Sequence, residues 1–275
     1  MAQDPSERVK ELLGNFELPR FRKTIFETLK RLRDPDSSTN QVCQVMSMDA
    51  DLVSRVMRTV NSTAYAPKQK ITALDHAIAM MGNSQLERIV MLIGARGATP
   101  QKTPQYLAIQ QFWKTAGKRA VLAKEVAEAT KPAAANLCFT AGFLQDIAVP
   151  LIAASKGEDY NLVYSTAAKG ERPLHMAEKD TFGWCHAELG AAVCAVWDMP
   201  EDLTGAVKDQ NEPESRLRPD AVHYVASLCD AHPESWTAEF IALVQSRHPE
   251  FNGEQIAAMI GACGGKADEL AKLIA

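Results

Sequence analysis

One carboxylate stands alone in the most apolar part of this chain. The stretch FTAGFLQDIAVPLIAAS, residues 139–155, contains Asp146 as its single charged residue. Apolar residues such as Phe143, Leu144 and Ile147 surround it and predict a helix that is buried on every side. An ionised carboxylate without a partner in such an interior costs several kcal/mol. Asp146 therefore needs either donors that bond it or a chemical function such as cation binding.

No other catalytic motif competes with this feature. The sequence contains no GxSxG, no P-loop, no HExxH and no GxGxxG followed by an acidic residue. The run GACGGK at 261–266 resembles a phosphate loop but lacks the Walker spacing and the Ser or Thr that ends it. We expect a turn between two helices there, with Gly264 just past the first of them.

The elements that position these residues are predicted to be helices. Apolar residues recur at helical spacing along the chain, for example at i, i+3 and i+4 within residues 40–47. Capping-box spacing predicts helix starts at Ser38 with Gln41 and at Ser84 with Glu87. No run of alternating β-branched residues lies between Gly or Pro turns, so a sheet is not expected. The predicted fold class is all-α.

Gly and Pro residues divide the chain into two parts. The segment GARGATPQKTP at 94–104 is the expected boundary. It separates an N-terminal helical lobe, residues 1–97, from a second helical lobe, residues 104–275.

Composition excludes several classes of function. The 275 residues are 46% hydrophobic and carry a net charge of −4, which gives no basic face for nucleic acid. The N-terminus has no apolar signal region, and no run of about eighteen apolar residues suggests a membrane span. The six cysteines form no CxxC pair, which favours reduced thiols. We expect a cytoplasmic protein that binds neither nucleic acid nor a membrane.

Short motifs resemble one protein family in their order along the chain. They are LP at 18–19, DPD at 34–36, DADL at 49–52, NSTAY at 61–65, ITALDHAIAMMG at 71–82, FW at 112–113, AGFLQDIA at 141–148, GWCHAELGAAVCAVWDMP at 183–200 and a degraded AVKDQNEP at 206–213. Together these motifs resemble the HDOD family of bacterial signalling proteins over about residues 18–232. The resemblance implies an all-helical fold related to the HD metal-dependent phosphohydrolases, with residues 104–275 as the HD-like lobe.

The resemblance also implies which residues stand at the metal positions of HD phosphohydrolases. In those enzymes a His, a His-Asp pair and a later Asp hold a metal that activates water. The corresponding residues here are Thr115, Gln145, Asp146 and Asp230. Thr115 and Gln145 offer only neutral oxygens and cannot replace imidazoles for a transition metal. We therefore expect no bound metal and no cofactor, with a divalent ion held weakly by Asp146 and Asp230 as the fallback.

His186 survives from the family pattern and belongs to the same expected vestigial pocket. It stands near a predicted helix start, where the helix dipole favours a neutral imidazole, and we interpret it as a structural histidine. Two accounts of Asp146 stay open. In the first it is a relic bonded by Thr115, Gln145 or backbone donors freed by Pro150, and in the second it is a live metal ligand.

A second polar group, Asn61, Ser62 and Tyr65, follows a predicted helix in the first lobe. We interpret Asn61 as a helix C-cap and Tyr65 as a residue packed at the lobe boundary. The alternative is a patch that binds a ligand or a partner.

The losses at the metal positions favour a non-catalytic signalling or scaffold protein of HDOD type. It would act through a protein partner in a bacterial signalling pathway, with a nucleotide-linked signal as a further option. The alternative is a metal-dependent phosphohydrolase or phosphodiesterase with a reduced ligand set. The implied fold suggests that activity, but a fold alone does not confer chemistry. The sequence sets no oligomeric state.

Overall fold

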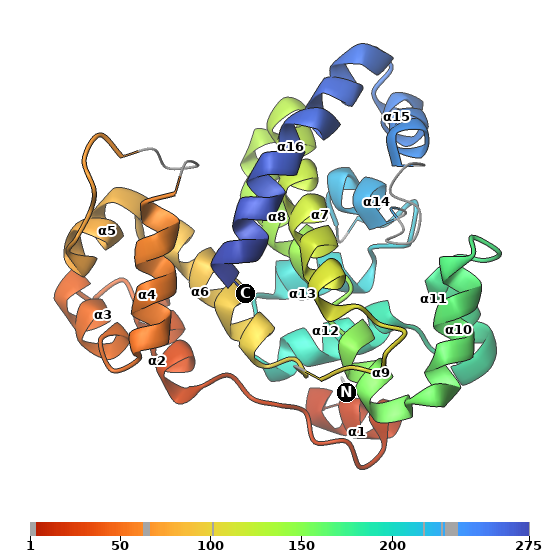
Figure 1. The fold of residues 1–275 in the computed structure, drawn as a ribbon, viewed down its shortest axis with the longest axis horizontal. Helices are drawn as coiled ribbons and strands as arrows, with labels where there is room; N and C mark the ends of the chain where they lie inside the picture. The colour runs from red at the N-terminus through yellow and green to blue at the C-terminus, as the bar shows by residue number, and fades with distance from the viewer. Residues whose placement is uncertain are drawn as a thin grey trace. The chain divides into compact units, whose positions relative to one another are not determined.

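The computed structural model describes residues 4–62, 67–100, 102–216, 218–226, 228 and 236–274. Every regular element in these ranges is helical (Figure 1), which confirms the all-α prediction. In chain order the helices are α1 (Pro5–Leu13), α2 (Lys23–Arg33), α3 (Thr39–Met46), α4 (Ala50–Val60), α5 (Leu74–Met81), α6 (Asn83–Gly97), α7 (Ile109–Thr130), the 3-10 helix η1 (Pro132–Ala134), α8 (Ala135–Leu144), α9 (Val149–Lys156), α10 (Glu158–Ala168), α11 (Leu174–Phe182), α12 (His186–Val196), α13 (Glu201–Lys208), α14 (Asp220–Ala226), α15 (Trp236–Arg247) and α16 (Gly253–Ile274).

The chain divides into two compact units. The small lobe comprises Pro19–Thr99 and Glu269–Ala275, and the large lobe comprises Met1–Leu18 and Pro100–Asp268. The break after Thr99 falls inside the Gly- and Pro-rich segment 94–104. Helix α1 precedes the small lobe in sequence but belongs to the large lobe.

Helix α1 joins the large lobe through one apolar face. Its side chains Val9, Leu12 and Leu13, at i, i+3 and i+4, are buried where α1 packs against α12 and α9. Arg8 adds an ion pair of 3.5 Å with Glu188 of α12. Most residues of α12 are apolar and buried, so the helix needs cover on this side as well as on its other faces.

Two of the predicted helix starts lie in the small lobe. Ser38 and Gln41 form the expected reciprocal capping box at the start of α3. The prediction at Ser84 and Glu87 is wrong, because α6 already begins at Asn83 and no side chain caps it. Gly82 is the N-cap and has a φ of 72°, a backbone conformation that favours glycine, so the helix starts two residues earlier than the capping pattern indicated.

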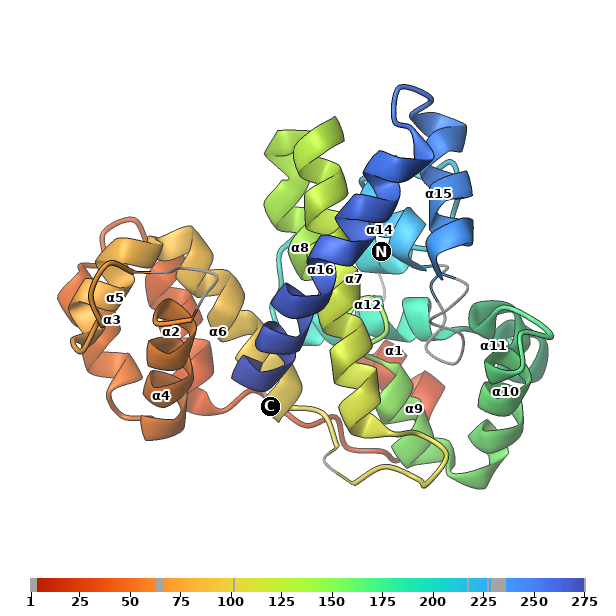
Figure 2. The same cartoon turned by 45° about the horizontal axis from the view of Figure 1, so that its top comes forward.

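In the large lobe, α7 and α8 lie side by side (Figures 1 and 2). A Cβ added at Gly142 of α8 would lie 3.0 Å from the Arg119 carbonyl oxygen of α7, so the missing side chain permits this close approach. Helix α16 also crosses α7, since a Cβ at Gly117 would lie 3.1 Å from the Ala267 carbonyl oxygen. The predicted turn at 261–266 is wrong, because α16 runs through it without a break.

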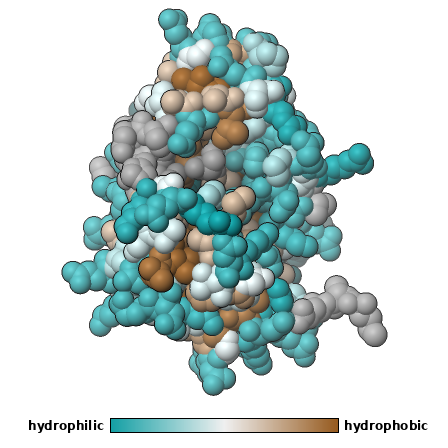
Figure 3. Space-filling view, turned by 90° about the vertical axis from the view of Figure 1, so that its right-hand side faces the viewer, coloured by the Kyte–Doolittle hydropathy of each residue, from teal (hydrophilic) through white to brown (hydrophobic). Residues whose placement is uncertain are grey.

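The apolar stretch that contains Asp146 belongs to the core of the large lobe. Residues Pro132–Lys156 have the length and apolarity of a membrane span, but 78% of the apolar window is buried inside the fold. The chain also breaks there, since α8 ends at Leu144 and α9 begins at Val149. Figure 3 shows one face of the molecule, which is mainly hydrophilic with small, separate apolar patches.

Candidate functional site

Asp146 lies in the turn between α8 and α9, within the large lobe. Pro150 stands in the first turn of α9, where its missing N–H has no helical partner to lose. The disruption of the helix near Asp146 that Pro150 was expected to cause is found, because α8 ends at Leu144 and α9 begins at Val149. The turn directs the Asp146 side chain inward, leaving only 15% of it exposed.

The partner of Asp146 is Arg119 of α7. One guanidinium nitrogen of Arg119 pairs with Asp146 Oδ2, and the other donates to the carbonyl oxygen of Leu228. The Arg119 side chain is 6% exposed, so this ion pair is largely shielded from water. The donors expected for Asp146 were Thr115, Gln145 or freed backbone groups. Arg119 takes that place because Gly142 brings α7 against α8 one turn before Asp146.

His186, the first residue of α12, continues the chain of contacts. Its Nε2 lies 3.4 Å from Asp146 Oδ1. Its Nδ1 lies 2.6 Å from Glu178 Oε2, on α11. The other Glu178 oxygen accepts a 2.5 Å hydrogen bond from the hydroxyl of Tyr160, on α10. Arg119, Asp146, His186, Glu178 and Tyr160 thus form one polar chain, called the charge relay cluster below, across four helices and the α8–α9 turn.

The charge relay cluster favours a charged imidazole. Burial lowers the pKa of His186, but the carboxylates of Glu178 and Asp146 outweigh burial and raise it above its ordinary value, against the opposing charge of Arg119. This direction runs against the expectation that the helix dipole favours a neutral His186, because the two carboxylates favour the charged form. Burial and the Glu178 carboxylate raise the pKa of Tyr160 well above its ordinary value, so the phenol stays protonated.

Thr115 and Gln145, the neutral residues at the expected metal positions, are both buried. Thr115 stands one turn before Arg119 on α7, on the same face. The Gln145 side chain is directed towards α14, where its Nε2 lies 3.4 Å from the Val225 carbonyl oxygen. Among the described residues, its buried Oε1 has no hydrogen-bond partner. Gln145 therefore supplies structural contacts to the backbone rather than a ligand beside Asp146.

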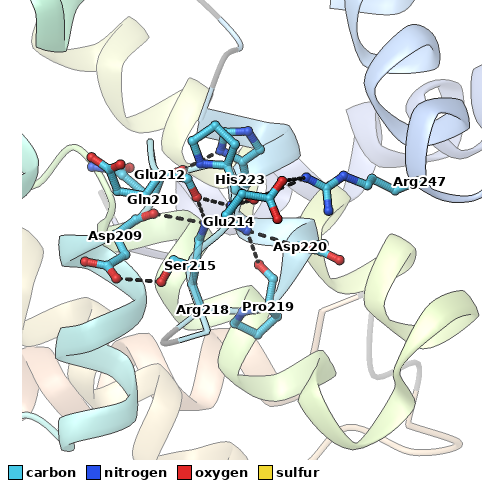
Figure 4. Close-up of polar contacts among 11 residues, drawn as sticks. Asp209, Gln210, Glu212, Glu214, Ser215, Arg218, Pro219, Asp220, His223 and Arg247 are labelled. Atoms are coloured by element: carbon cyan, nitrogen blue, oxygen red, sulfur yellow. Dashed lines mark hydrogen bonds and ion pairs between the residues drawn. The ribbon is translucent and has the colours of Figure 1, made fainter.

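The loop after α13 carries the degraded motif DQNEP, and a second buried arginine organises it. The Arg218 guanidinium donates hydrogen bonds to the carbonyl oxygens of Asp209, Glu212 and Pro213. It also lies 3.4 Å from the Pro219 carbonyl oxygen and 3.4 Å from the Asp220 carboxylate (Figure 4).

This loop is tied to the α8–α9 turn through Gln210. The Gln210 amide donates to the Gln145 carbonyl oxygen at 2.7 Å, and the Gln210 carbonyl oxygen accepts from His223 Nδ1 at 2.9 Å. The motif residues thus hold helices together.

The residues that the structure describes do not fit a divalent metal. Asp146 is neutralised by a guanidinium, which carries a permanent charge. Both ring nitrogens of His186 face carboxylates, which favour protonated nitrogens, whereas a metal needs an unprotonated nitrogen. In the described ranges no group of three His, Cys, Asp or Glu side chains is placed to hold a metal ion.

Two expected site residues, Asp230 and Tyr65, lie outside the described residues. In the small lobe, Asn61 is the C-cap of α4, with a φ of −92° rather than a left-handed conformation. Its amide donates to the carbonyl oxygens of Met57 and Ile71, and its Oδ1 accepts from the Ile71 N–H at 2.8 Å. Ser62 is buried beside it. The hydrogen bonds of the Asn61 side chain thus fix Ile71 against the end of α4.

Sequence reasoning missed Arg119, Glu178 and Tyr160. Arg119 carried a usable signal, since it stands among Ala116, Ala120 and Ala123 on an apolar helix face, as Asp146 does in its own segment. Two charges of opposite sign on apolar helix faces are expected to form an ion pair, because each is costly to bury alone. Glu178 carried no such signal, because the charged residues Lys179 and Asp180 follow it directly.

Comparisons with known proteins identify the family and support the all-helical fold. The HDOD domain matches residues 18–213. A crystal structure from Shewanella amazonensis SB2B, of a protein provisionally named a phosphohydrolase, superposes with a TM-score of 0.76, at 23% identity, over 100% of this chain and 99% of that one. An HDOD domain protein of unknown function from Geobacter sulfurreducens superposes with a TM-score of 0.72, at 18% identity, over 97% and 96%.

Two further relatives are longer than this chain. A protein of Marinobacter aquaeolei VT8, provisionally named for signal transduction, superposes with a TM-score of 0.70, at 17% identity, over 100% of this chain and 62% of that one. An uncharacterized protein of Treponema pallidum (strain Nichols) is 23% identical over 195 residues, which are 70% of this chain and 37% of that protein. The chain thus spans little more than a third of that relative. Since the family matches most of its length, the chain belongs to the HDOD domain family.

Proposed function

We propose that this protein is a non-catalytic signal-transduction or scaffold protein that acts by binding another protein. The observation that carries the proposal is the ion pair between Arg119 and Asp146. In an HD phosphohydrolase the aspartate of the His-Asp pair ligates the metal that activates water. Here its counterpart already has a cationic partner, and the residue before it, Gln145, is directed away to the α14 backbone.

The remaining parts of the proposal concern partners and place. We propose a protein partner in a bacterial signalling pathway, in line with the name of the Marinobacter relative. No cofactor, nucleic acid or membrane takes part in this scheme, and the protein acts in the cytoplasm. The net charge of −4 supports the exclusion of nucleic acid.

The alternative is a metal-dependent phosphohydrolase or phosphodiesterase with a reduced ligand set. One observation favours it, namely that Asp146 and His186 remain neighbours, with 3.4 Å between Oδ1 and Nε2. The guanidinium on the other oxygen of Asp146 counts against it, because a divalent ion would have to displace or repel that charge.

A hydrolysis screen separates the two functions. The wild type, Asp146→Ala and Asp180→Ala are incubated with phosphomonoesters, nucleotides and cyclic dinucleotides in the presence of Mg²⁺, Mn²⁺ or Fe²⁺. Asp180 is the matched control, since it is an exposed aspartate in a surface ion pair with Arg172. We expect no metal-dependent turnover from any of the three. Turnover that Asp180→Ala retains and Asp146→Ala loses would establish the phosphohydrolase instead.

A further inference from the structure

The Arg119 guanidinium reaches the segments that carry the expected metal positions. It stands one turn after Thr115 on α7, pairs with the carboxylate of Asp146, and donates to the carbonyl oxygen of Leu228. Leu228 precedes the expected position of the last ligand, Asp230, by two residues. One side chain therefore holds together the parts of the chain that a metal ion joins in an HD phosphohydrolase.

The charge balance of the charge relay cluster depends on this guanidinium. Its described ionisable members are two carboxylates, Asp146 and Glu178, one guanidinium, the phenol of Tyr160, which stays protonated, and the imidazole of His186 between the carboxylates. With Arg119 and a protonated His186 the cluster is neutral. Without Arg119 it would keep two buried carboxylates against a single imidazolium, and a buried excess of negative charge is costly.

We propose that Arg119 is a built-in cation that replaces the metal ion of this site, and that the site binds a free guanidinium-class cation once the Arg119 side chain is removed. The planar, two-pronged shape of the ligand follows from the contacts, since one prong meets the Asp146 carboxylate and the other the Leu228 carbonyl oxygen. The inference deepens the proposed function, on whose ion-paired Asp146 it rests.

Chemical rescue of a truncated side chain tests the proposal. Melting temperatures are measured for the wild type, Arg119→Ala and the double variant Arg119→Ala, Asp146→Asn, each with 0 to about 20 mM methylguanidinium. We expect Arg119→Ala to melt below the wild type and to recover several degrees as the ligand fills the space, by linkage to the folded state. The wild type, whose site is filled, and the double variant, which lacks the carboxylate, should show no rise. An equal response of all three proteins, or none in a folded Arg119→Ala, would overturn the proposal.

A second comparison keeps the proposal testable should Arg119→Ala fail to fold. Arg119→Lys retains the charge without the fork, whereas Arg119→Met retains much of the length without the charge. We expect the denaturant midpoint of unfolding to fall in the order Arg, Lys, Met. A midpoint for Arg119→Met at or above that of Arg119→Lys would show that the site needs volume and not a cation. The hydrolysis screen tests the proposed function independently of the role of Arg119. Metal-dependent turnover would overturn the proposed function without deciding the melting and unfolding results, and those results could overturn the role of Arg119 without any turnover.

Discussion

One carboxylate oxygen of Glu178 accepts two hydrogen bonds from His186, one from the backbone N–H at 2.7 Å and one from ring Nδ1 at 2.6 Å. His186 is the first residue of α12, so its N–H is one of the donors that a helix start leaves without an intrahelical partner. Cys185, at the N-cap position, makes no capping hydrogen bond with its side chain. Glu178 of α11 therefore caps α12 from a neighbouring helix while it orients the imidazole.

This double contact predicts a large effect of Glu178→Gln on stability. The substitution keeps the shape but removes the charge, and the amide offers a single acceptor to three donors, two from His186 and one from Tyr160. We expect a loss of about 1–3 kcal/mol for each buried donor left unsatisfied, measured by urea unfolding. The His186 pKa, followed by NMR, should fall in the same variant.

Glu188→Gln is the matched control, because it makes the same change in α12, two residues after His186. Glu188 is about one-third exposed and pairs with Arg8 at 3.5 Å, so its loss should cost at most about 1 kcal/mol. Equal losses in the two variants would refute the capping role of Glu178.

The raised pKa of His186 predicts a dependence of stability on pH. Asp146 and Glu178 face its ring, and Arg119 and His175 oppose its charge. Because the folded-state pKa lies above the unfolded value near 6.5, the stabilising contribution is fully present below about pH 6.5. It is lost as pH rises through the folded-state pKa.

The measurement is the difference in unfolding free energy between the parent and His186→Gln from pH 5.5 to 8.5. Both proteins carry His175→Gln, since burial and the nearby His186 charge lower the His175 pKa, and its titration would add stability at high pH. We expect the difference to be largest at low pH and to shrink steadily above pH 6.5. A difference that grows with pH would contradict the assigned direction.

Sequence alone predicted the all-α class, the break at Asp146 and the proximity of His186 to Asp146, because each depends on local pattern or on family order. It did not predict the partner of Asp146. That contact depends on how closely α7 and α8 approach, which Gly142 decides across the interface. Nor did it predict the cap of α12, because Glu178 reaches His186 from another helix.

Gly142→Ala tests whether close packing of α7 and α8 positions the Arg119–Asp146 pair. The new Cβ would lie 3.0 Å from the Arg119 carbonyl oxygen and 3.2 Å from Ala123 Cβ, so the helices must separate. We expect a loss of about 1–3 kcal/mol in unfolding free energy, as for other overpacked interiors. Gly261→Ala is the control, because that glycine lies inside α16 with nothing within 4 Å of the added Cβ. The control should gain up to about 1 kcal/mol from helix propensity, and a gain in both variants would exclude the packing argument.

Asn61→Ala tests the structural role of Asn61 in the small lobe. The substitution removes three hydrogen bonds to the backbone, two of them to Ile71. We expect a loss of about 1–3 kcal/mol for each buried backbone group left without a partner, measured by chemical denaturation. Asn161→Ala, which removes side-chain hydrogen bonds with Glu158 and Ser165 within α10, should change stability by at most about 0.5 kcal/mol. A fully stable Asn61→Ala protein would return Asn61 to the set of candidate binding residues.

The last prediction concerns rebuilding the metal site. Replacing the neutral residues by Thr115→His and Gln145→His restores the imidazoles at the expected metal positions, but Arg119 remains beside Asp146. The guanidinium keeps the carboxylate occupied and repels a divalent ion, so Mn²⁺ should not raise the melting temperature of this double variant. Adding Arg119→Ala should release Asp146, and Mn²⁺ at a hundred times its dissociation constant would then stabilise the fold by about 2.7 kcal/mol.

The triple variant with a further Asp146→Asn is the control and should not respond. Equal stabilisation of the double and triple variants would show that Arg119 does not block the site. A folded triple variant that Mn²⁺ leaves unchanged would mean that Thr115 and Gln145 do not occupy the histidine positions of an HD site. We expect binding without turnover, because holding the metal restores only the first requirement of phosphoester hydrolysis.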